Sequence, residues 1–360
     1  MPRLLALSVV VPVRDSGSSL DSVLAAIRAS ELTAVEYEII VVDDGSTDES
    51  VMVAARYADT VVRLRGPASG PAYARNRGAE LACGDVVAFV DGDVLVGPDT
   101  LRRILTLFAE RPDIDAVAAS RDERSGAPNF VSHYWNLLVS FGEVRHGGEC
   151  AHFAAGCAAV RRSVLSSAGM YDEWRFSKGG VEGLELGQRL LGAGHVVQLS
   201  SDLKVRHLKR WTLRSMCLEV WHRSMLLTRS LGYQRMSSVA PSDVVFTLSR
   251  AMIPALGIVA TLTLSAAFVP RPYVVMKIAM AVVAFVLTNW SVHRYYARAR
   301  GFLFALASAP LHLCVQAVSA VALCVGWILR DAFGDILPDA ATQAYSEVGL
   351  ETWPPVRRRP

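Results

Sequence analysis

Two aspartates, Asp91 and Asp93, stand two positions apart at the end of an apolar run that begins at Val86. The run is rich in β-branched and aromatic residues and has no polar face, which is typical of a strand covered on both sides. If this strand extends to Val94, its alternation would point both carboxylates to the same face. Two hard oxygen ligands at the carboxyl end of a strand suit Mg²⁺ or Mn²⁺, especially when phosphate oxygens also bind the ion. The alternative is a polar turn that caps the strand.

A second acidic strand end, Asp43-Asp44, comes earlier in the chain. Strand and helix patterns alternate through this region, which indicates an α/β fold with a doubly wound, mostly parallel sheet. The carboxyl ends of parallel strands lie on one rim, so all four aspartates would share it, although loop chemistry alone also explains Asp43 and Asp44. The expected strands are Leu7–Val13, Glu38–Val42 and Thr60–Leu64, and the expected helices are Leu20–Ala29, Glu49–Tyr57 and Pro71–Leu81.

A loop of small residues, Gly66 to Gly70, leads into the expected helix that carries Arg75. A helix start of this kind offers free N–H groups and the positive end of the helix dipole. A guanidinium can add two parallel hydrogen bonds to a phosphate. The loop and Arg75 therefore indicate a phosphate site, with a solvated helix face as the alternative.

The composition divides the chain into a charged part and an apolar part. The 360 residues carry a net charge of +3, which gives no case for a nucleic-acid partner. Charges crowd the first two thirds of the chain, and long uncharged runs follow Arg250. We expect an N-terminal globular domain over residues 1–209, an amphipathic juxtamembrane segment over 210–250, transmembrane helices over 251–330 and a loosely structured tail over 331–360.

Three apolar runs, 251–269, 273–290 and 302–329, are long enough to cross a bilayer. Arginines gather between the second and third runs, and the positive-inside rule places such a loop in the cytosol. With one crossing per run, the chain would be a multi-pass protein of the cell membrane, with a cytoplasmic N-terminal domain and an external C-terminus.

Four motifs occur in a fixed order: Val10–Asp15, Val41–Asp48, Gly70–Gly78 and Asp91–Asp93. Together they resemble glycosyltransferase family 2, whose members are inverting enzymes with a type-A nucleotide-sugar fold (GT-A). The segments Ala155–Arg162 and Gly169–Glu173 are similar to the acceptor side of that family. The likeness covers roughly residues 5–215.

The resemblance implies roles for particular residues on the donor side. Pro12, Asp43 and Asp44 would face the base and ribose of a nucleotide-sugar donor, with UDP as the expected nucleotide. Arg75 would lie near the nucleotide or its diphosphate. These roles agree with a phosphate site at the start of the helix that carries Arg75.

The resemblance also implies a divalent metal, Mn or Mg, as the cofactor. Asp91 and Asp93 would hold the sugar-diphosphate, Asp93 through the metal, which would neutralise the leaving group as a Lewis acid. His207 is a candidate third ligand, although a lone histidine is more often structural. Arg210 and Trp211 resemble the end of the Gln-x-x-Arg-Trp motif of processive polysaccharide synthases, which makes them candidate substrate-binding residues.

One departure from the family concerns the catalytic base. The family commonly places Glu-Asp before a helix of the form Glu-Leu-x-x-Arg-Leu, whereas this chain has Gly183 at the aspartate position. An alcohol acceptor needs a base for its proton, and Glu182 is the nearest carboxylate, with Glu185 as the second candidate. A phosphate acceptor needs no base, and weakened catalysis is the remaining explanation. Glu182 could also be an acidic residue that favours a helix start.

The motifs and the apolar runs together predict a membrane-anchored, metal-dependent, inverting glycosyltransferase. The expected partners are a nucleotide-sugar donor, a lipid-linked or cell-envelope glycan acceptor, and the membrane. Two alternatives stay open: a polyprenyl-phosphate glycosyltransferase, and a non-catalytic membrane protein that binds a nucleotide sugar.

Overall fold

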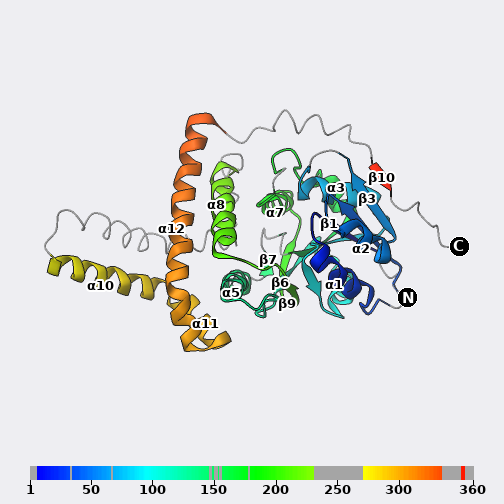
Figure 1. Cartoon of the computed structure of the whole chain (residues 1–360). Helices are drawn as coiled ribbons and strands as arrows, with labels where there is room; N and C mark the ends of the chain where they lie inside the picture. The colour runs from blue at the N-terminus through cyan, green and yellow to red at the C-terminus, as the bar shows by residue number, and fades with distance from the viewer. Residues whose placement is uncertain are drawn as a thin grey trace.

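The computed structural model describes residues 6–32, 35–65, 68–145, 148–149, 153, 156–176, 179–230, 271–334 and 350–352. Within these residues an N-terminal α/β domain packs against a group of helices from the second half of the chain (Figure 1). The predicted run at 251–269 lies outside the described residues, and so does most of the predicted tail.

The N-terminal half of the sheet is parallel, as the alternation of strands and helices predicts. The strand β1 (Leu7–Val13) lies between β2 (Tyr37–Asp43) and β4 (Val86–Val90), and β2 continues to β3 (Thr60–Leu64). The register aligns Val13 with Asp43 and Phe89 with Val10. The carboxyl ends of β1, β2 and β4 therefore meet along one edge.

The other half of the sheet makes it mixed, so the expectation of a mostly parallel sheet was wrong. The strand β8 (Cys157–Arg161) runs antiparallel between β4 and β6 (Ala116–Arg121). The long strand β9 (Val197–His207) is parallel to β6 but antiparallel to β5 (Val94–Val96) and β7 (Gly148–Glu149). At the opposite edge, β10 (Leu350–Thr352) pairs antiparallel with β3.

Helices cover both faces of the sheet, and their apolar stripes form two cores. One core joins the sheet to α1 (Gly17–Arg28), α2 (Ser50–Tyr57) and α4 (Thr100–Glu110). The second core joins the other face to α3 (Pro71–Leu81), α6 (Arg162–Ser167) and α7 (Glu182–Gly192). Side chains of β1 alternate between the two cores, as a strand covered on both faces requires.

The predicted strand through Asp91 and Asp93 ends earlier than expected, at Val90. The N–H of Val94 donates to the carbonyl of Asp91 at 3.0 Å, which closes a turn before β5 begins. The two aspartates therefore lie in a turn, and strand alternation does not decide where their side chains point.

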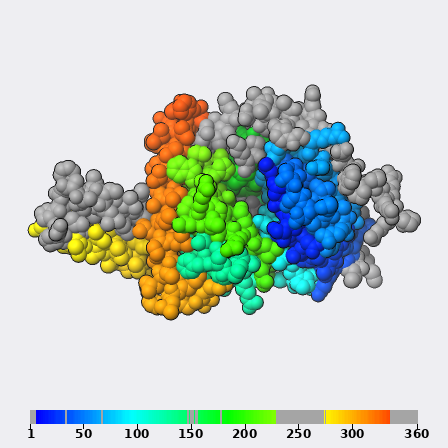
Figure 2. All heavy atoms as spheres, viewed as in Figure 1, coloured from blue at the N-terminus to red at the C-terminus, as the bar shows by residue number. Residues whose placement is uncertain are grey.

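The second half of the chain forms long helices. The helices α8 (Leu213–Ser230) and α12 (Phe302–Phe333) lie side by side, and α5 (Phe130–Arg145) and α11 (Trp290–Arg300) pack against the same group (Figures 1 and 2). The helix α10 (Arg271–Thr288) projects away from this group on the side opposite the sheet (Figure 1).

Three transmembrane helices are not confirmed. Among the described residues, α12 alone is long and apolar enough to cross a membrane by itself. The predicted second run corresponds to α10, which is bent by 67° from the following helix α11, so at most this pair makes one broken span. The third run forms the continuous helix α12, which contains Pro310 in its interior.

A close approach between α3 and the sheet gives a first prediction. A methyl group added at Gly78 would lie 2.3 Å from Cγ1 of Val10 on β1. Because such overpacking typically costs about 1–3 kcal/mol, Gly78→Ala should lower the free energy of unfolding by that amount. Urea unfolding followed by tryptophan fluorescence measures it.

The matched control is Gly192→Ala, because a methyl group at Gly192 on α7 meets nothing within 4 Å. We expect this variant to be as stable as the wild type or slightly more stable. Equal unfolding free energies for the two variants would contradict the packing of α3 on β1.

Candidate functional site

A cavity of about 770 Å³ lies at the carboxyl ends of β1, β2 and β4, bounded by the starts of α3 and α7 and by one side of α8. Most residues singled out in the sequence line it. They are Pro12, Asp44, Arg75, Asp91, Asp93, Glu182, His207 and Trp211. Asp43, Glu185 and Arg210 are not among the lining residues.

Arg75 is the central cation of the cavity. Its Nη2 donates to Oδ1 of Asp91 at 2.8 Å, and its Nη1 donates to Oε1 of Glu182, also at 2.8 Å. The guanidinium also lies 5.4 Å from the ring centroid of Tyr171. Burial alone would lower the pKa of Arg75, but Asp91 and the other anionic neighbours raise it above its ordinary value. A single cation from α3 thus joins the turn after β4 to the start of α7.

Glu182 is buried yet ionised. Burial favours a raised pKa for its carboxyl, but the charge and hydrogen bond of Arg75 prevail and hold the pKa below its ordinary value. Its second oxygen, Oε2, is buried and has no hydrogen-bond partner among the described residues. An ionised oxygen with a vacant acceptor position can take a proton from a hydroxyl group.

Asp44 organises the loop that opens α3. Its two carboxylate oxygens accept the N–H groups of Ser69 at 2.7 Å and Gly70 at 2.8 Å. Gly70 has a φ of 94°, which favours glycine, and Pro71 then begins the helix. Burial is the main cause of a raised pKa for Asp44. The neighbouring Asp43 is fully buried and accepts the N–H of Ser46, so it shapes the turn after β2.

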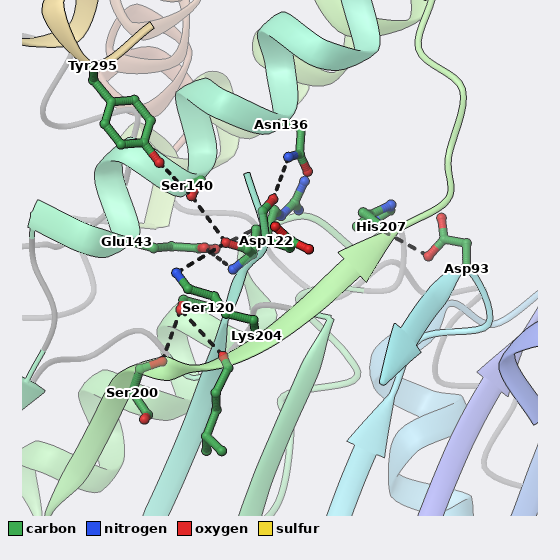
Figure 3. A network of polar contacts seen from close by, with 12 residues as sticks. Asp93, Ser120, Asp122, Asn136, Ser140, Glu143, Ser200, Lys204, His207 and Tyr295 are labelled. Atoms are coloured by element: carbon green, nitrogen blue, oxygen red, sulfur yellow. Dashed lines mark hydrogen bonds and ion pairs between the residues drawn. The ribbon is translucent and has the colours of Figure 1, made fainter. Parts of the chain in front are cut away.

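Asp93 and His207 face each other across the ends of two strands (Figure 3), with Oδ1 and Nε2 3.6 Å apart. Burial, followed by the charge of Asp91, raises the pKa of Asp93 to about 6. Burial, with the charges of Arg121 and Lys209, holds the pKa of His207 well below its ordinary value, so the imidazole is neutral near pH 7.

These two groups fit a divalent metal in part. Two atoms that each lie about 2.1 Å from one ion are separated by about 3–4 Å, which the Asp93–His207 pair satisfies. A neutral imidazole and a carboxylate are suitable ligands. No group of three His, Cys, Asp or Glu side chains in the described part of the chain could hold a metal. The remaining ligands would have to be phosphate oxygens and water.

Arg121, at the end of β6, lines the cavity and was not found from the sequence. Its backbone N–H donates to Oε2 of Glu143 on α5 at 2.6 Å, and Ser140 of the same helix donates to its carbonyl at 3.1 Å (Figure 3). Burial raises the pKa of Glu143 to about 7, although Arg121 opposes the shift. The one sequence feature that could have indicated the contact between Arg121 and Glu143 is that Glu143 is the single carboxylate in the mainly apolar helix α5.

The helix α8 forms a wall of the cavity, where the sequence suggested a helix on a membrane surface. Glu219, His222 and Arg223 of α8 line the cavity. Trp211, just before α8, is buried beside Trp135, with ring centroids 5.6 Å apart, whereas Arg210 is exposed.

Glu185 supports the fold around the cavity. It holds Arg189 through two contacts of 2.9 Å, and Arg189 also donates to the carbonyls of Ala168 and Met170. This arrangement ties α7 to the loop after α6.

The bridge through Arg75 gives a second prediction. Arg75→Met leaves the carboxylates of Asp91 and Glu182 without their shared cation, so the free energy of unfolding should fall by about 3 kcal/mol. The double variant Arg75→Met/Glu182→Gln should recover part of that loss, because one of the two charges is removed. Urea unfolding of both variants measures the coupling.

Arg102→Met is the control, because Arg102 makes a 3.4 Å ion pair with Glu31 in which both side chains are about half exposed. Such a pair contributes at most about 1 kcal/mol. A loss in Arg75→Met no larger than in Arg102→Met would contradict a buried bridge.

The chain is similar in sequence to several known glycosyltransferases. Residues 8–169 match the family model "Glycosyl transferase family 2". The chain is 39% identical over 119 residues to the uncharacterized glycosyltransferase YibD of Escherichia coli K12, which covers 32% of the chain and 34% of that protein. It is 30% identical over 145 residues to glucosyl-dolichyl phosphate glucuronosyltransferase of Haloferax volcanii, which covers 38% and 46%.

A third relative matches a longer part of the chain. Pre-mycofactocin glycosyltransferase of Mycobacterium tuberculosis H37Rv is 29% identical over 215 residues, which covers 58% of this chain and 43% of that protein. The matched segments therefore span less than half of each of these three relatives.

Among solved structures, the mannosyltransferase PcManGT of Pyrobaculum calidifontis, in complex with GDP-Man and Mn²⁺, superposes with a TM-score of 0.63. The superposition covers 90% of this chain and 88% of that one at 17% identity, so it shows a shared fold. The family match and the shared fold confirm the predicted GT-A type of sheet. Residues 8–169 are thus similar in sequence to glycosyl transferase family 2.

Proposed function

We propose that the chain is an inverting glycosyltransferase that moves a sugar from a nucleoside-diphosphate donor to a hydroxyl group of a lipid-linked or cell-envelope acceptor. The observation that carries the proposal is the state of Glu182, whose Oε1 is paired with Arg75 and whose buried Oε2 has no partner in the described structure. The similarity to family 2 supports the reaction class. The names of several relatives, which are glycosyltransferases, also support it.

The donor would occupy the side of the cavity formed by Pro12, Asp44 and the start of α3. Pro71 and Ala74 line the cavity there, so the positive end of the helix dipole favours the diphosphate. Asp91 and Asp93 lie beyond this helix start, where the sugar-diphosphate would reach them. The expected UDP and the GDP-sugar bound by PcManGT are both candidates for the nucleotide.

The transfer step would use Glu182 as the general base. The acceptor oxygen forms a bond to the anomeric carbon while the bond from that carbon to the diphosphate oxygen breaks, and the hydroxyl proton passes to Oε2 of Glu182. Attack opposite the leaving group inverts the configuration. Arg75 keeps Glu182 ionised until the proton is transferred and keeps its side chain in place throughout. A divalent metal held by Asp93 and His207, as the Mn²⁺ in the PcManGT complex suggests, would supply charge neutralisation for the diphosphate.

Exposed apolar surface supports attachment to a membrane. Along α10, Val275, Met280 and Leu287 are each more than 60% exposed, which is unusual for helices in water. A membrane-attached active site favours an acceptor that is itself linked to a lipid.

The third prediction concerns the base. Glu182→Gln should lower turnover on a hydroxyl acceptor by about 10²–10⁴-fold and leave the affinity for the nucleoside diphosphate unchanged. Glu185→Gln is the comparator, because Glu185 holds Arg189 and does not line the cavity. Transfer of a radiolabelled sugar from a panel of nucleotide sugars to membrane lipids measures the turnover of both variants.

Full turnover of Glu182→Gln on a hydroxyl acceptor would refute the assignment of Glu182 as the general base. If sugar is transferred only to a polyprenyl phosphate, and Glu182→Gln does so at the full rate, the protein is instead a polyprenyl-phosphate glycosyltransferase. Gly183 permits this alternative because a phosphate acceptor is already ionised. Nucleotide-sugar binding with neither transfer nor hydrolysis would identify a binding protein.

The fourth prediction concerns the metal and pH. Because Asp93 has a pKa of about 6 in the ligand-free protein, protons compete with a metal below that pH. The apparent Kd for Mn²⁺ in the presence of UDP or GDP should rise roughly tenfold per pH unit below about pH 6 and stay level above about pH 7. Calorimetric titrations across this range test it.

Asp93→Asn should weaken Mn²⁺ binding and remove the rise in apparent Kd that the wild type shows below about pH 6. Asp113→Asn is the control, because Asp113 is exposed and Arg111 holds its pKa below its ordinary value. Metal-dependent binding that is the same in Asp93→Asn and the wild type would exclude Asp93 as a ligand.

A further inference from the structure

The helix α12 is amphipathic in the reverse sense of a helix in water. Its exposed large apolar residues lie toward the two ends of the helix, with Leu303 (79% exposed) and Leu306 (60%) at the start and Trp327 (63%) and Ile328 (58%) near the end, whereas residues 311–320 between them are half-buried or buried. Its buried side carries polar residues, namely Ser308, His312, Gln316 and Ser319. Apolar side chains exposed toward both ends of the helix, with polar groups turned inward, fit contact with lipid.

The globular part of the protein covers the other side of α12 along the same length. His312 of α12 makes a 2.9 Å hydrogen bond with Tyr134 of α5, and Ser224 of α8 donates to Ser319 at 3.3 Å. Farther on, Gly326 packs against Met225 and Thr228 of α8. From Ala305 to Gly326 the buried side extends about 30 Å, which equals the thickness of the hydrocarbon core.

A membrane-crossing α12 would therefore carry α8 into the bilayer. The helix α8 contains Arg214, Glu219 and Arg223, and the last two line the cavity. Charged side chains at the centre of a bilayer are costly, and a cavity that takes a nucleotide has to reach water. The position of α8 is thus incompatible with α12 as a span.

The chain after α12 returns to the sheet of the N-terminal domain. Backbone pairing places Leu350 opposite Leu64, and Thr352 opposite Val62. The connecting residues 335–349 include Asp335, Asp339 and Glu347 and are too few to cross a bilayer as a helix. The C-terminal end of α12 therefore lies on the same side of a membrane as β3, and the hydrogen bond from Tyr295 of α11 to Glu123 at 3.0 Å ties the N-terminal end to the same domain.

We propose that α12 lies in the plane of a bilayer surface, with the face from Leu303 to Ile328 on the lipid, and does not cross the membrane. The bend of 67° after α10 directs that apolar helix away from α11, on the side of the molecule opposite the sheet (Figure 1). Arg294 and Arg298 are exposed on α11, one turn apart, where they match anionic lipid headgroups. The occupant of the exposed face is thus a phospholipid bilayer with anionic headgroups.

This topology differs from the one predicted from the sequence. The third apolar run is long enough to span, but length and hydropathy do not distinguish a helix that crosses a bilayer from one that lies on it. The predicted external C-terminus is replaced by one on the side of the N-terminal domain. The topology is independent of the transfer reaction, so it can fail or hold without affecting the proposed function.

The first test uses the full chain with one epitope tag before Met1 and another after Pro360. Protease is added to sealed inside-out and right-side-out membrane vesicles, and each tag is detected by immunoblot. An in-plane α12 predicts that both tags are lost in the same vesicle preparation and protected in the other. Loss of the two tags in opposite preparations, or absence of the protein from the membrane fraction, would overturn the proposal.

The second test measures depth along α12 with spin labels at Leu306→Cys, Val321→Cys and Ile328→Cys in a cysteine-free chain, bound to vesicles with anionic lipid. Oxygen and water-soluble nickel accessibilities should give a similar, shallow depth for all three positions. A label at Met52→Cys, 71% exposed on α2, is the aqueous control. A maximum of depth at Val321, or accessibilities equal to those at Met52, would contradict the proposal. If the cysteine-free chain does not fold, the tag experiment decides alone.

Discussion

The shared ion pair of Arg75 is the interaction on which the rest of the cavity depends. Two carboxylates, Asp91 and Glu182, come from segments about ninety residues apart, and the buried Glu182 would not remain ionised without a cation. Arginine suits this position because its planar fork donates to both at once and stays charged when buried. The turn after β4, the start of α3 and the start of α7 are consequently fixed relative to one another.

The same pair explains how a chain with Gly183 in place of an aspartate can retain a base. Glu182 begins α7, where the helix dipole and Arg75 both favour the carboxylate. Binding one oxygen to Arg75 fixes the side chain and leaves Oε2 for a substrate. The cost is a dependence on Arg75, since loss of that one side chain would disturb both the proposed donor side and the proposed base.

Local sequence predicted the residues at strand ends and helix starts better than the contacts between distant segments. Asp44, Asp91 and Asp93 were found because each follows an apolar strand whose direction is readable, and Glu182 was found through the family resemblance at the start of its helix. Arg121 and Glu143 were missed because their contact joins β6 to a helix that the motifs do not mark. The antiparallel position of β8 was missed because the sequence of a short buried strand does not reveal its direction.

Hydropathy located the apolar helices without revealing what surrounds them. The run from Phe302 onward reads as a span because its composition is apolar, yet one of its faces meets α8 and α5. The helix α8 was expected on a membrane surface because it mixes basic and apolar residues, and the sequence did not reveal that one side of it forms a wall of the cavity. In both cases the segment that packs against the helix determines its surroundings, and the hydropathy pattern of a single sequence does not identify that segment.

The most direct test of the account is the ionisation state of Glu182, read by infrared difference spectroscopy between the wild type and Glu182→Gln. The account predicts that Glu182 contributes a carboxylate band and no protonated-carboxyl band near neutral pH, and that the protonated band appears in an Arg75→Met background. A protonated Glu182 in the wild-type protein near pH 7, or a spectrum that Arg75→Met leaves unchanged, would contradict it.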